Sequence, residues 1–262
     1  MNEKIAVMSL SGGMDSTGLL TRLLSDGYEV HALSFNYGQK HSVELERAKM
    51  NVAYMRDMGL NIATHEIGDL SSVMGLFNSA LLDSAVEVPE GHYEQANMVA
   101  TVVPNRNAIF SSIVYGFALS IATKRKANVK ICLGVHSGDH AIYPDCRPEF
   151  YEEIGKAFAS GNWESERVDF LLPYIDGDKT TILRDASIAC FDLGLDFNTV
   201  FANTCTSYNP DSEGRSSGTS GADVERILAF YDVGKIDPVT YVNGWESALA
   251  NALQVRDEWS RK

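Results

Sequence analysis

The sequence predicts an α/β protein built on a doubly wound, Rossmann-like parallel sheet, with a mainly helical C-terminal part. Short apolar runs alternate with segments of helical periodicity, the pattern of parallel strands joined by helices. A glycine-rich turn joins the first apolar run to the first helix. A chain of 262 residues with 45% hydrophobic residues can bury one full core. We therefore expect a single domain over 1–262, with an α/β core in 1–150 and a helical part in 151–262.

The predicted elements follow one another in the order that this fold needs. Helical spacing covers 17–25 and 42–58, and a helix that is apolar on most faces follows Asn107. A loop-rich passage leads to Val103, and the chain from Pro148 onward is mainly helical. The apolar runs of strand length lie at 4–9, 29–35, 61–66 and 130–135.

Polar residues follow three of the predicted strands, after Ser9, Phe35 and Val135. In open parallel sheets, ligands bind in the crevice beyond the carboxyl ends of the strands. We therefore expect these three clusters to converge on one crevice.

Composition excludes several classes of protein. A net charge of −13 and a pI near 4.8 disfavour a broad nucleic-acid-binding surface, which needs an excess of Lys and Arg. No segment approaches the ~20 apolar residues that span a bilayer, and no targeting segment is evident. We expect a cytoplasmic protein that binds neither membrane nor nucleic acid. The four cysteines form no Cys-x-x-Cys pair, so their spacing does not indicate a zinc tetrad. They are Cys132, Cys146, Cys190 and Cys205.

The turn after the first strand, SLSGGMDST over 9–17, has residue types that suit a polyphosphate. Glycines let the backbone approach closely, hydroxyls and backbone N–H groups donate, and the helix dipole favours negative charge. Asp15 can hold a magnesium ion against the pyrophosphate. The alternative is a plain strand-to-helix turn with an N-capping serine. The predicted phosphate contacts are Ser9, Leu10, Ser11, Gly12, Gly13, Asp15, Ser16 and Thr17.

No Walker lysine follows this turn, so it is not the loop of γ-phosphate hydrolases. It resembles the SGGxDS loop of PP-loop ATP pyrophosphatases. That resemblance implies cleavage of ATP between its α and β phosphates, with AMP placed on a substrate oxygen. Because several enzyme families share this loop, it does not name the substrate.

Three longer motifs make the resemblance specific. They are LSFNYGQKH over 33–41 with Glu44-Leu45, VPNRNAIF over 103–110, and GVHSGDHAIYPDCRPEF over 134–150. A weaker match includes Arg226, Asp237 and Tyr241. These motifs resemble those of the QueC family of 7-cyano-7-deazaguanine synthases. The resemblance implies that 7-carboxy-7-deazaguanine is adenylated, that ammonia gives the amide, and that a second adenylation gives the nitrile.

Several motif residues offer groups for ATP. Phe35 can pack on adenine, although a core phenylalanine is the alternative, and Gln39, Lys40 and His41 offer donors toward phosphate or acyl oxygen. Arg106 suits a phosphate clamp because its planar fork binds phosphate bidentately; the alternative is a solvated helix start. We predict ATP contacts from Phe35, Gln39, Arg106 and Gly134, and catalytic roles for Asp15, Lys40, His41 and Arg106.

The third motif supplies candidates for substrate recognition. Asp145 and Arg147 flank Cys146 between two prolines and would complement the donors and acceptors of a deazaguanine edge, whereas a rigid turn with a surface ion pair is the alternative. His136, Asp139 and His140 resemble a metal cluster, but they complete no recognisable ligand set, which favours polar contacts within the loop. The predicted substrate-binding residues are Asn107, His136, Asp139, Tyr143, Pro144, Asp145 and Arg147.

The resemblance also implies a structural zinc site near the C-terminus, in the 205–226 loop, and here the sequence departs from the family. The four positions of the zinc-binding cysteines hold Ser207, Ser217, Ser220 and Asp223. Three hydroxyls and one carboxylate do not form the thiolate set that binds zinc tightly. We therefore predict ATP and Mg²⁺ as cofactors, and no zinc.

This departure leaves the nucleophile open between ammonia and a protein amine, since QueC-like proteins of antiphage defence attach the activated acyl group to a protein. A non-catalytic nucleotide-binding module that docks a partner protein is a further alternative. The acidity of the chain disfavours a tRNA modifier built on the same loop. A homodimer is expected because dimers are common among soluble enzymes.

Overall fold

The computed structural model describes residues 3–39, 43–82, 96–208 and 210–261. Within these residues five parallel strands form one sheet in the order β3-β2-β1-β4-β5. The chain runs outward from the central strand β1 in one direction, then crosses to β4 and β5 on the other side, which places a topological switch point between β1 and β4. The strands are β1 (Ile5–Ser9), β2 (Glu29–Asn36), β3 (Ile62–Asp69), β4 (Val129–Cys132) and β5 (Val168–Leu171).

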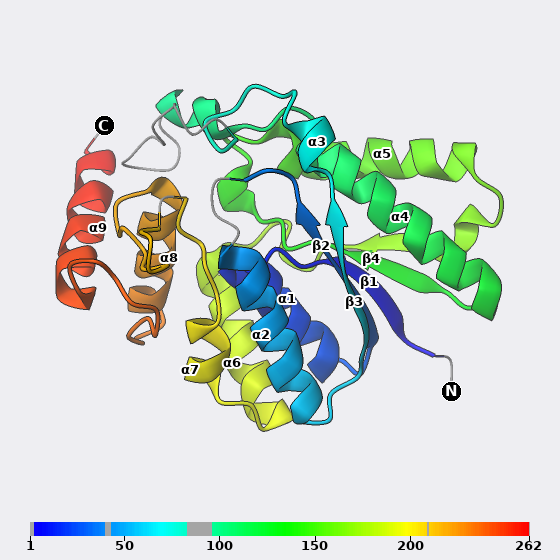
Figure 1. Ribbon diagram of the computed structural model, residues 1–262, viewed down its shortest axis with the longest axis horizontal. Coiled ribbons are helices and arrows are strands. Elements are labelled where there is room, and N and C mark those ends of the chain that lie inside the picture. The colour runs from blue at the N-terminus through cyan, green and yellow to red at the C-terminus, as the bar shows by residue number, and fades with distance from the viewer. Residues whose placement is uncertain (1–2, 40–42, 83–95, 209, 262) are drawn as a thin grey trace.

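Helices cover both faces of this sheet (Figure 1). On one face, strand residues such as Ala6 and Met8 pack against α1 (Met14–Ser25), α2 (Val43–Asp57), α6 (Lys179–Leu193) and α7 (Phe197–Ala202). On the opposite face, Ile5 and Val7 pack against α4 (Arg106–Arg125) and α5 (Pro148–Gly161). Alternate strand residues thus feed two separate cores. The predicted doubly wound α/β fold is confirmed.

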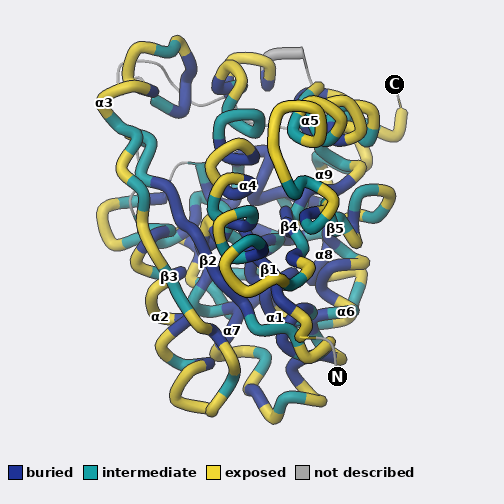
Figure 2. The backbone as a smooth tube through the Cα atoms, turned by 90° about the vertical axis from the view of Figure 1, so that its right-hand side faces the viewer, coloured by how far each residue is buried: buried dark blue, intermediate teal, exposed yellow. Residues whose placement is uncertain are grey.

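Burial falls from the centre of the sheet to its edge. Strands β1 and β2 are buried along most of their length, whereas β3 is buried only at Ile62 and is half-buried or exposed beyond it (Figure 2). None of the helices in the described residues is both long enough and apolar enough to span a membrane.

Two strand predictions needed correction. The strand expected at 130–135 ends at Cys132, and residues 133–135 leave the sheet. The edge strand β5 was not predicted, because its four residues carry no continuous apolar run. Since β5 pairs with β4, the α/β core continues past residue 150.

The last two helices, α8 (Gly221–Asp232) and α9 (Trp245–Trp259), pack on each other, and α8 also contacts α6. A fully buried ion pair anchors α8, with Arg226 Nε 2.6 Å from Asp237 Oδ2. Tyr241 Oη donates to the same oxygen at 2.7 Å. Arg226, Asp237 and Tyr241, the residues of the weaker motif match, therefore form one buried polar network. The shorter helices are α3 (Ser71–Met74), η1 (Ala96–Thr101), η2 (Ser137–Asp139), η3 (Pro144–Cys146) and η4 (Ser165–Arg167).

Candidate active site

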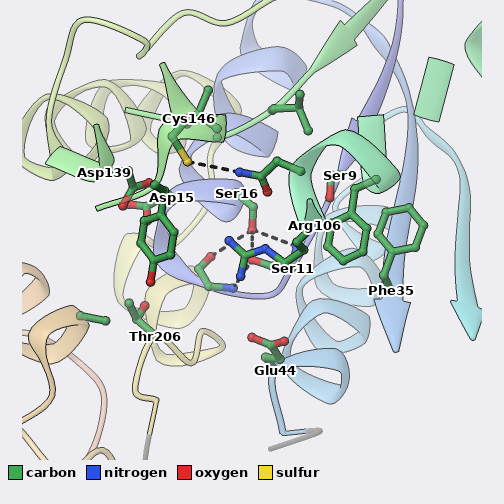
Figure 3. Close-up of a pocket in the computed structure, with 18 of the residues that line it drawn as sticks. Ser9, Ser11, Asp15, Ser16, Phe35, Glu44, Arg106, Asp139, Cys146 and Thr206 are labelled. Carbon is green, nitrogen blue, oxygen red and sulfur yellow. Dashed lines mark hydrogen bonds between the residues drawn. The ribbon is translucent and has the colours of Figure 1, made fainter. Parts of the chain in front are cut away.

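A pocket lies beyond the carboxyl ends of β1 and β4, at the switch point of the sheet. Its walls come from the turn after β1, the end of β2, the start of α4, the segment after β4 and the 205–208 segment. Figure 3 shows side chains from these segments around one space. The clusters after Ser9, Phe35 and Val135 therefore converge, as the sequence predicts.

The turn between β1 and α1 is folded tightly at the floor of this pocket. Ser11 Oγ lies 2.9 Å from Ser16 Oγ and accepts a hydrogen bond from the Gly13 N–H at 3.2 Å. Gly12 has a φ of 89°, and a Cβ there would lie 1.9 Å from the Glu44 carbonyl oxygen. Only glycine fits at position 12. The turn presents hydroxyls and a helix N-terminus to the pocket, an arrangement suited to phosphate.

Backbone from two other segments encloses the turn. The Cys205 N–H donates to the Gly12 carbonyl at 3.0 Å, and the Met14 N–H donates to Thr206 Oγ1 at 3.2 Å. On the other side, a Cβ at Gly134 would lie 3.1 Å from the carbonyl carbon of Asp15. The turn is held in place from both sides.

A buried charge cluster lies at one side of the turn. Lys179 Nζ is 3.2 Å from Asp15 Oδ2, 3.0 Å from Glu225 Oε2 and 2.8 Å from His136 Nε2. His136 Nε2 also lies 3.7 Å from the carboxylates of Asp15 and Asp139. Burial alone would raise the pKa of Asp15, but Lys179 and His136 outweigh it and hold that pKa well below its usual range. Asp15 is therefore ionised at neutral pH.

Arg106 begins α4 and reaches the pocket among aromatic rings. Its guanidinium carbon lies 5.8 Å from the centre of the Tyr143 ring, and the hydroxyls of Tyr37 and Tyr208 lie nearby. No carboxylate of the described residues lies within 4.0 Å of its guanidinium. Arg106 is therefore a cation that an anionic ligand can bind.

Comparison with known proteins places this arrangement in a family. Residues 5–234 match the family described as "Queuosine biosynthesis protein QueC". The chain belongs to the QueC family.

Curated relatives of this QueC-family chain are similar over nearly their whole length. It is 42% identical over 241 residues to the 7-cyano-7-deazaguanine synthase of Marinomonas sp. (strain MWYL1), covering 92% of this chain and 99% of that protein. It is 43% identical over 236 residues to the synthase of Hahella chejuensis, covering 90% and 92%. A solved NMN synthetase from Francisella tularensis matches 96% of this chain and 86% of its own, at 11% identity and a TM-score of 0.38, which is too low to carry any conclusion.

The four positions at which the resemblance implies zinc-binding cysteines lie together in this chain. The hydroxyls of Ser207, Ser217 and Ser220 donate to Asp223 Oδ2 at 2.8, 2.8 and 2.9 Å. The Gly218 N–H donates to the same oxygen at 3.1 Å, and Asp223 is fully buried. A carboxylate thus occupies the centre of the cluster. This donor set does not fit zinc, because the hydroxyl groups are directed at the carboxylate and offer no thiolate.

Many predicted site residues share the pocket. Phe35 is on its wall but stacks on Phe110, with ring centroids 4.3 Å apart, so one face of the ring is already covered. Leu10 and Thr17 are fully buried beneath the turn. The predicted residues that line the pocket are Ser9, Ser11, Gly13, Asp15, Ser16, Phe35, Arg106, Asn107, Gly134, Asp139 and Tyr143.

The predicted pair Asp145 and Arg147 is not among the lining residues. Asp145 Oδ2 accepts from the Asn107 N–H at 3.1 Å and so caps the start of α4. Arg147 is exposed and donates to the His140 carbonyl at 2.8 Å. Pro144 is exposed in the same turn. The substrate-binding role of these residues stays a prediction.

Other predicted residues lie beside the pocket or beyond the description. Lys40 and His41 fall outside the described residues. Gln39 Nε2 donates a hydrogen bond to Glu44 Oε1 at 2.9 Å. Gln39 therefore contacts a side chain that lines the pocket but does not line it itself. His136 is buried and reaches the pocket through Lys179.

Sequence reasoning missed Lys179 and assigned no role to Glu44, although both line the pocket. Asp178 marks the start of α6 as an N-cap, with its side chain accepting from the Thr181 N–H at 2.7 Å. A lysine one residue later is usually solvated, so the sequence gives no sign of its burial.

We predict that Gly134→Ala lowers the free energy of unfolding by ~1–3 kcal/mol, because the added methyl group meets backbone of α1 that cannot move cheaply. Gly116→Ala, on an exposed position of α4 with open space around it, is the matched control and should stabilise by ~0.5–1 kcal/mol. Denaturant titration measures both. Equal effects of the two substitutions on the free energy of unfolding would contradict the close contact between Gly134 and the backbone of Asp15.

Proposed function

We propose that this chain is an enzyme that uses ATP to adenylate 7-carboxy-7-deazaguanine and then transfers the acyl group to a nitrogen nucleophile. The observation that carries the proposal is the enclosed glycine turn, which shares one pocket with Arg106, a cation that forms no ion pair with any described carboxylate. Membership of the QueC family and the names of its curated relatives support the substrate.

The residues of the turn suit the triphosphate. The hydroxyls of Ser11 and Ser16, with the N-terminus of α1, would donate to phosphate oxygens. Arg106 would neutralise the charge that develops on the departing pyrophosphate. With both ends of the triphosphate fixed, a substrate carboxylate oxygen can attack the α-phosphorus in line. The acyl adenylate forms and pyrophosphate leaves.

A magnesium ion fits the donor set beside this turn. Asp15 lines the pocket, and its Oδ1 is buried without a hydrogen-bond partner among the described residues. Asp15 would hold the ion, which when bound would neutralise phosphate charge. Lys179 would keep the carboxylate ionised and oriented.

The name of the curated relatives, 7-cyano-7-deazaguanine synthase, supports ammonia as the nucleophile. Ammonia would give the amide, and a second adenylation would remove its oxygen to leave the nitrile. The altered cysteine positions motivate a protein amine as the alternative acceptor. Mass spectrometry of the product formed with ammonia, or with a candidate protein, distinguishes the two.

We predict that Asp15→Asn reduces AMP formation from ATP and 7-carboxy-7-deazaguanine at least ~100-fold, because one electrostatic group at the reacting phosphates is lost. Asp57→Asn, exposed at the end of α2, makes the same chemical change away from the pocket and should leave the rate unchanged. Retention of full activity by Asp15→Asn would refute the role of this carboxylate. A wild-type chain that forms no AMP would be a binding module.

We also propose that the hydrogen-bonded cluster around Asp223 stabilises the 205–226 loop without zinc. Asp223→Ala removes the acceptor of three hydroxyls and should cost at least ~1–3 kcal/mol of unfolding free energy. A zinc chelator should leave the wild-type melting temperature unchanged. Replacement of all four positions by cysteine should create a chelator-sensitive zinc protein. Stoichiometric zinc in the purified wild-type chain would contradict this proposal.

A further inference from the structure

The acyl-transfer step of the proposed function needs a base, and the inference below rests on that function. Ammonia and alkylamines are mostly protonated near neutral pH, and a protonated nitrogen has no lone pair with which to attack a carbonyl carbon. The pocket must therefore hold a group that accepts a proton from the incoming amine.

Three carboxylates of the described residues line the pocket: Asp15, Asp139 and Glu44. Asp15 is paired with Lys179, and Asp139 lies 3.7 Å from His136 Nε2. Glu44 has no cationic side chain of the described residues within 4.0 Å. Its Oε1 instead accepts a hydrogen bond from Gln39. Of the three carboxylates, Glu44 is the one best able to take up a proton.

The surroundings of Glu44 shift the pKa of its carboxyl group toward neutral pH, where a base must accept a proton. Burial raises its pKa to about 7, and the Gln39 amide and the Arg106 guanidinium oppose this shift only in part. Within the part of the chain that the structure describes, the other titratable groups that face it are Tyr37 and Cys205. Burial and the nearby Glu44 raise the pKa of Tyr37 to about 12 and that of Cys205 to about 11, so both stay protonated at neutral pH.

The position of Glu44 is fixed relative to the phosphate-binding turn. Gly12 packs so closely on the Glu44 carbonyl that no side chain fits between them. The first turn of α2 therefore cannot shift without moving the turn that would hold the phosphates. Figure 3 shows Glu44 at the rim of the pocket, on the same side as Ser11.

We propose that Glu44 is the base that deprotonates the amine nucleophile. Its carboxylate takes one proton from the ammonium ion or protonated amine, and the freed nitrogen lone pair forms the C–N bond to the acyl carbon. The bond from that carbon to the AMP oxygen breaks, and AMP leaves with the bonding electrons. The second proton lost from nitrogen passes to water. Protonated Glu44 then returns its proton to solvent.

The test separates adenylation from transfer. Adenylate is formed from ATP, magnesium and 7-carboxy-7-deazaguanine without amine, and ammonium or hydroxylamine is then added. Glu44→Gln should keep pyrophosphate exchange near the wild-type rate but form amide from ammonium at least ~100-fold more slowly. Hydroxylamine, which is uncharged at neutral pH, should restore transfer. Glu46→Gln, exposed on the same helix, is the matched control and should match the wild type.

A pH profile of the wild-type transfer step needs no variant. Because the base works in its ionised form, the ammonium-dependent rate should fall as the pH drops below about 7. Equal amide formation by the two glutamine variants, or a wild-type profile without this inflection, would overturn the role of Glu44. Loss of pyrophosphate exchange in Glu44→Gln would move the residue to ATP binding and also overturn it. Absence of pyrophosphate exchange in the wild type would instead sink the proposed function itself.

Discussion

The close enclosure of the glycine turn after β1 is the constraint on which the rest of the site depends. Helix α2 packs on Gly12, the 205–206 segment hydrogen-bonds to the turn, and Gly134, which follows β4, packs tightly on the backbone of Asp15. Backbone groups held on all these sides cannot reorient cheaply when charge develops nearby. One tight turn therefore also fixes where Glu44 and Thr206 lie.

Two cationic side chains lie at the pocket of this acidic chain. The protein carries a net charge of −13, yet Lys179 and Arg106 lie at one pocket. Lys179 is paired with the carboxylates of Asp15 and Glu225, whereas Arg106 is surrounded by tyrosines. Lys179 keeps Asp15 ionised, whereas Arg106 remains available to bind an anionic ligand. The two cations thus take different parts in the same site.

The convergence of three predicted polar clusters on one pocket followed from the sequence, because a parallel sheet brings the carboxyl ends of its strands to one edge. Lys179 did not, because its burial depends on partners such as His136, 43 residues away in the chain. Asp145 and Arg147 lie two residues apart, but the short turn between them directs one to α4 and the other to solvent. Motif spacing predicts which segments meet, and only packing decides which side chains face the ligand.

The central claim is that a substrate carboxylate captures AMP in this pocket. The most direct measurement uses 7-carboxy-7-deazaguanine labelled with heavy oxygen in its carboxylate, with ATP, magnesium and ammonia, and determines the mass of the AMP released. Attack by the carboxylate on the α-phosphorus requires that each AMP carry one labelled oxygen. AMP free of label, or ADP in its place, would contradict the claim.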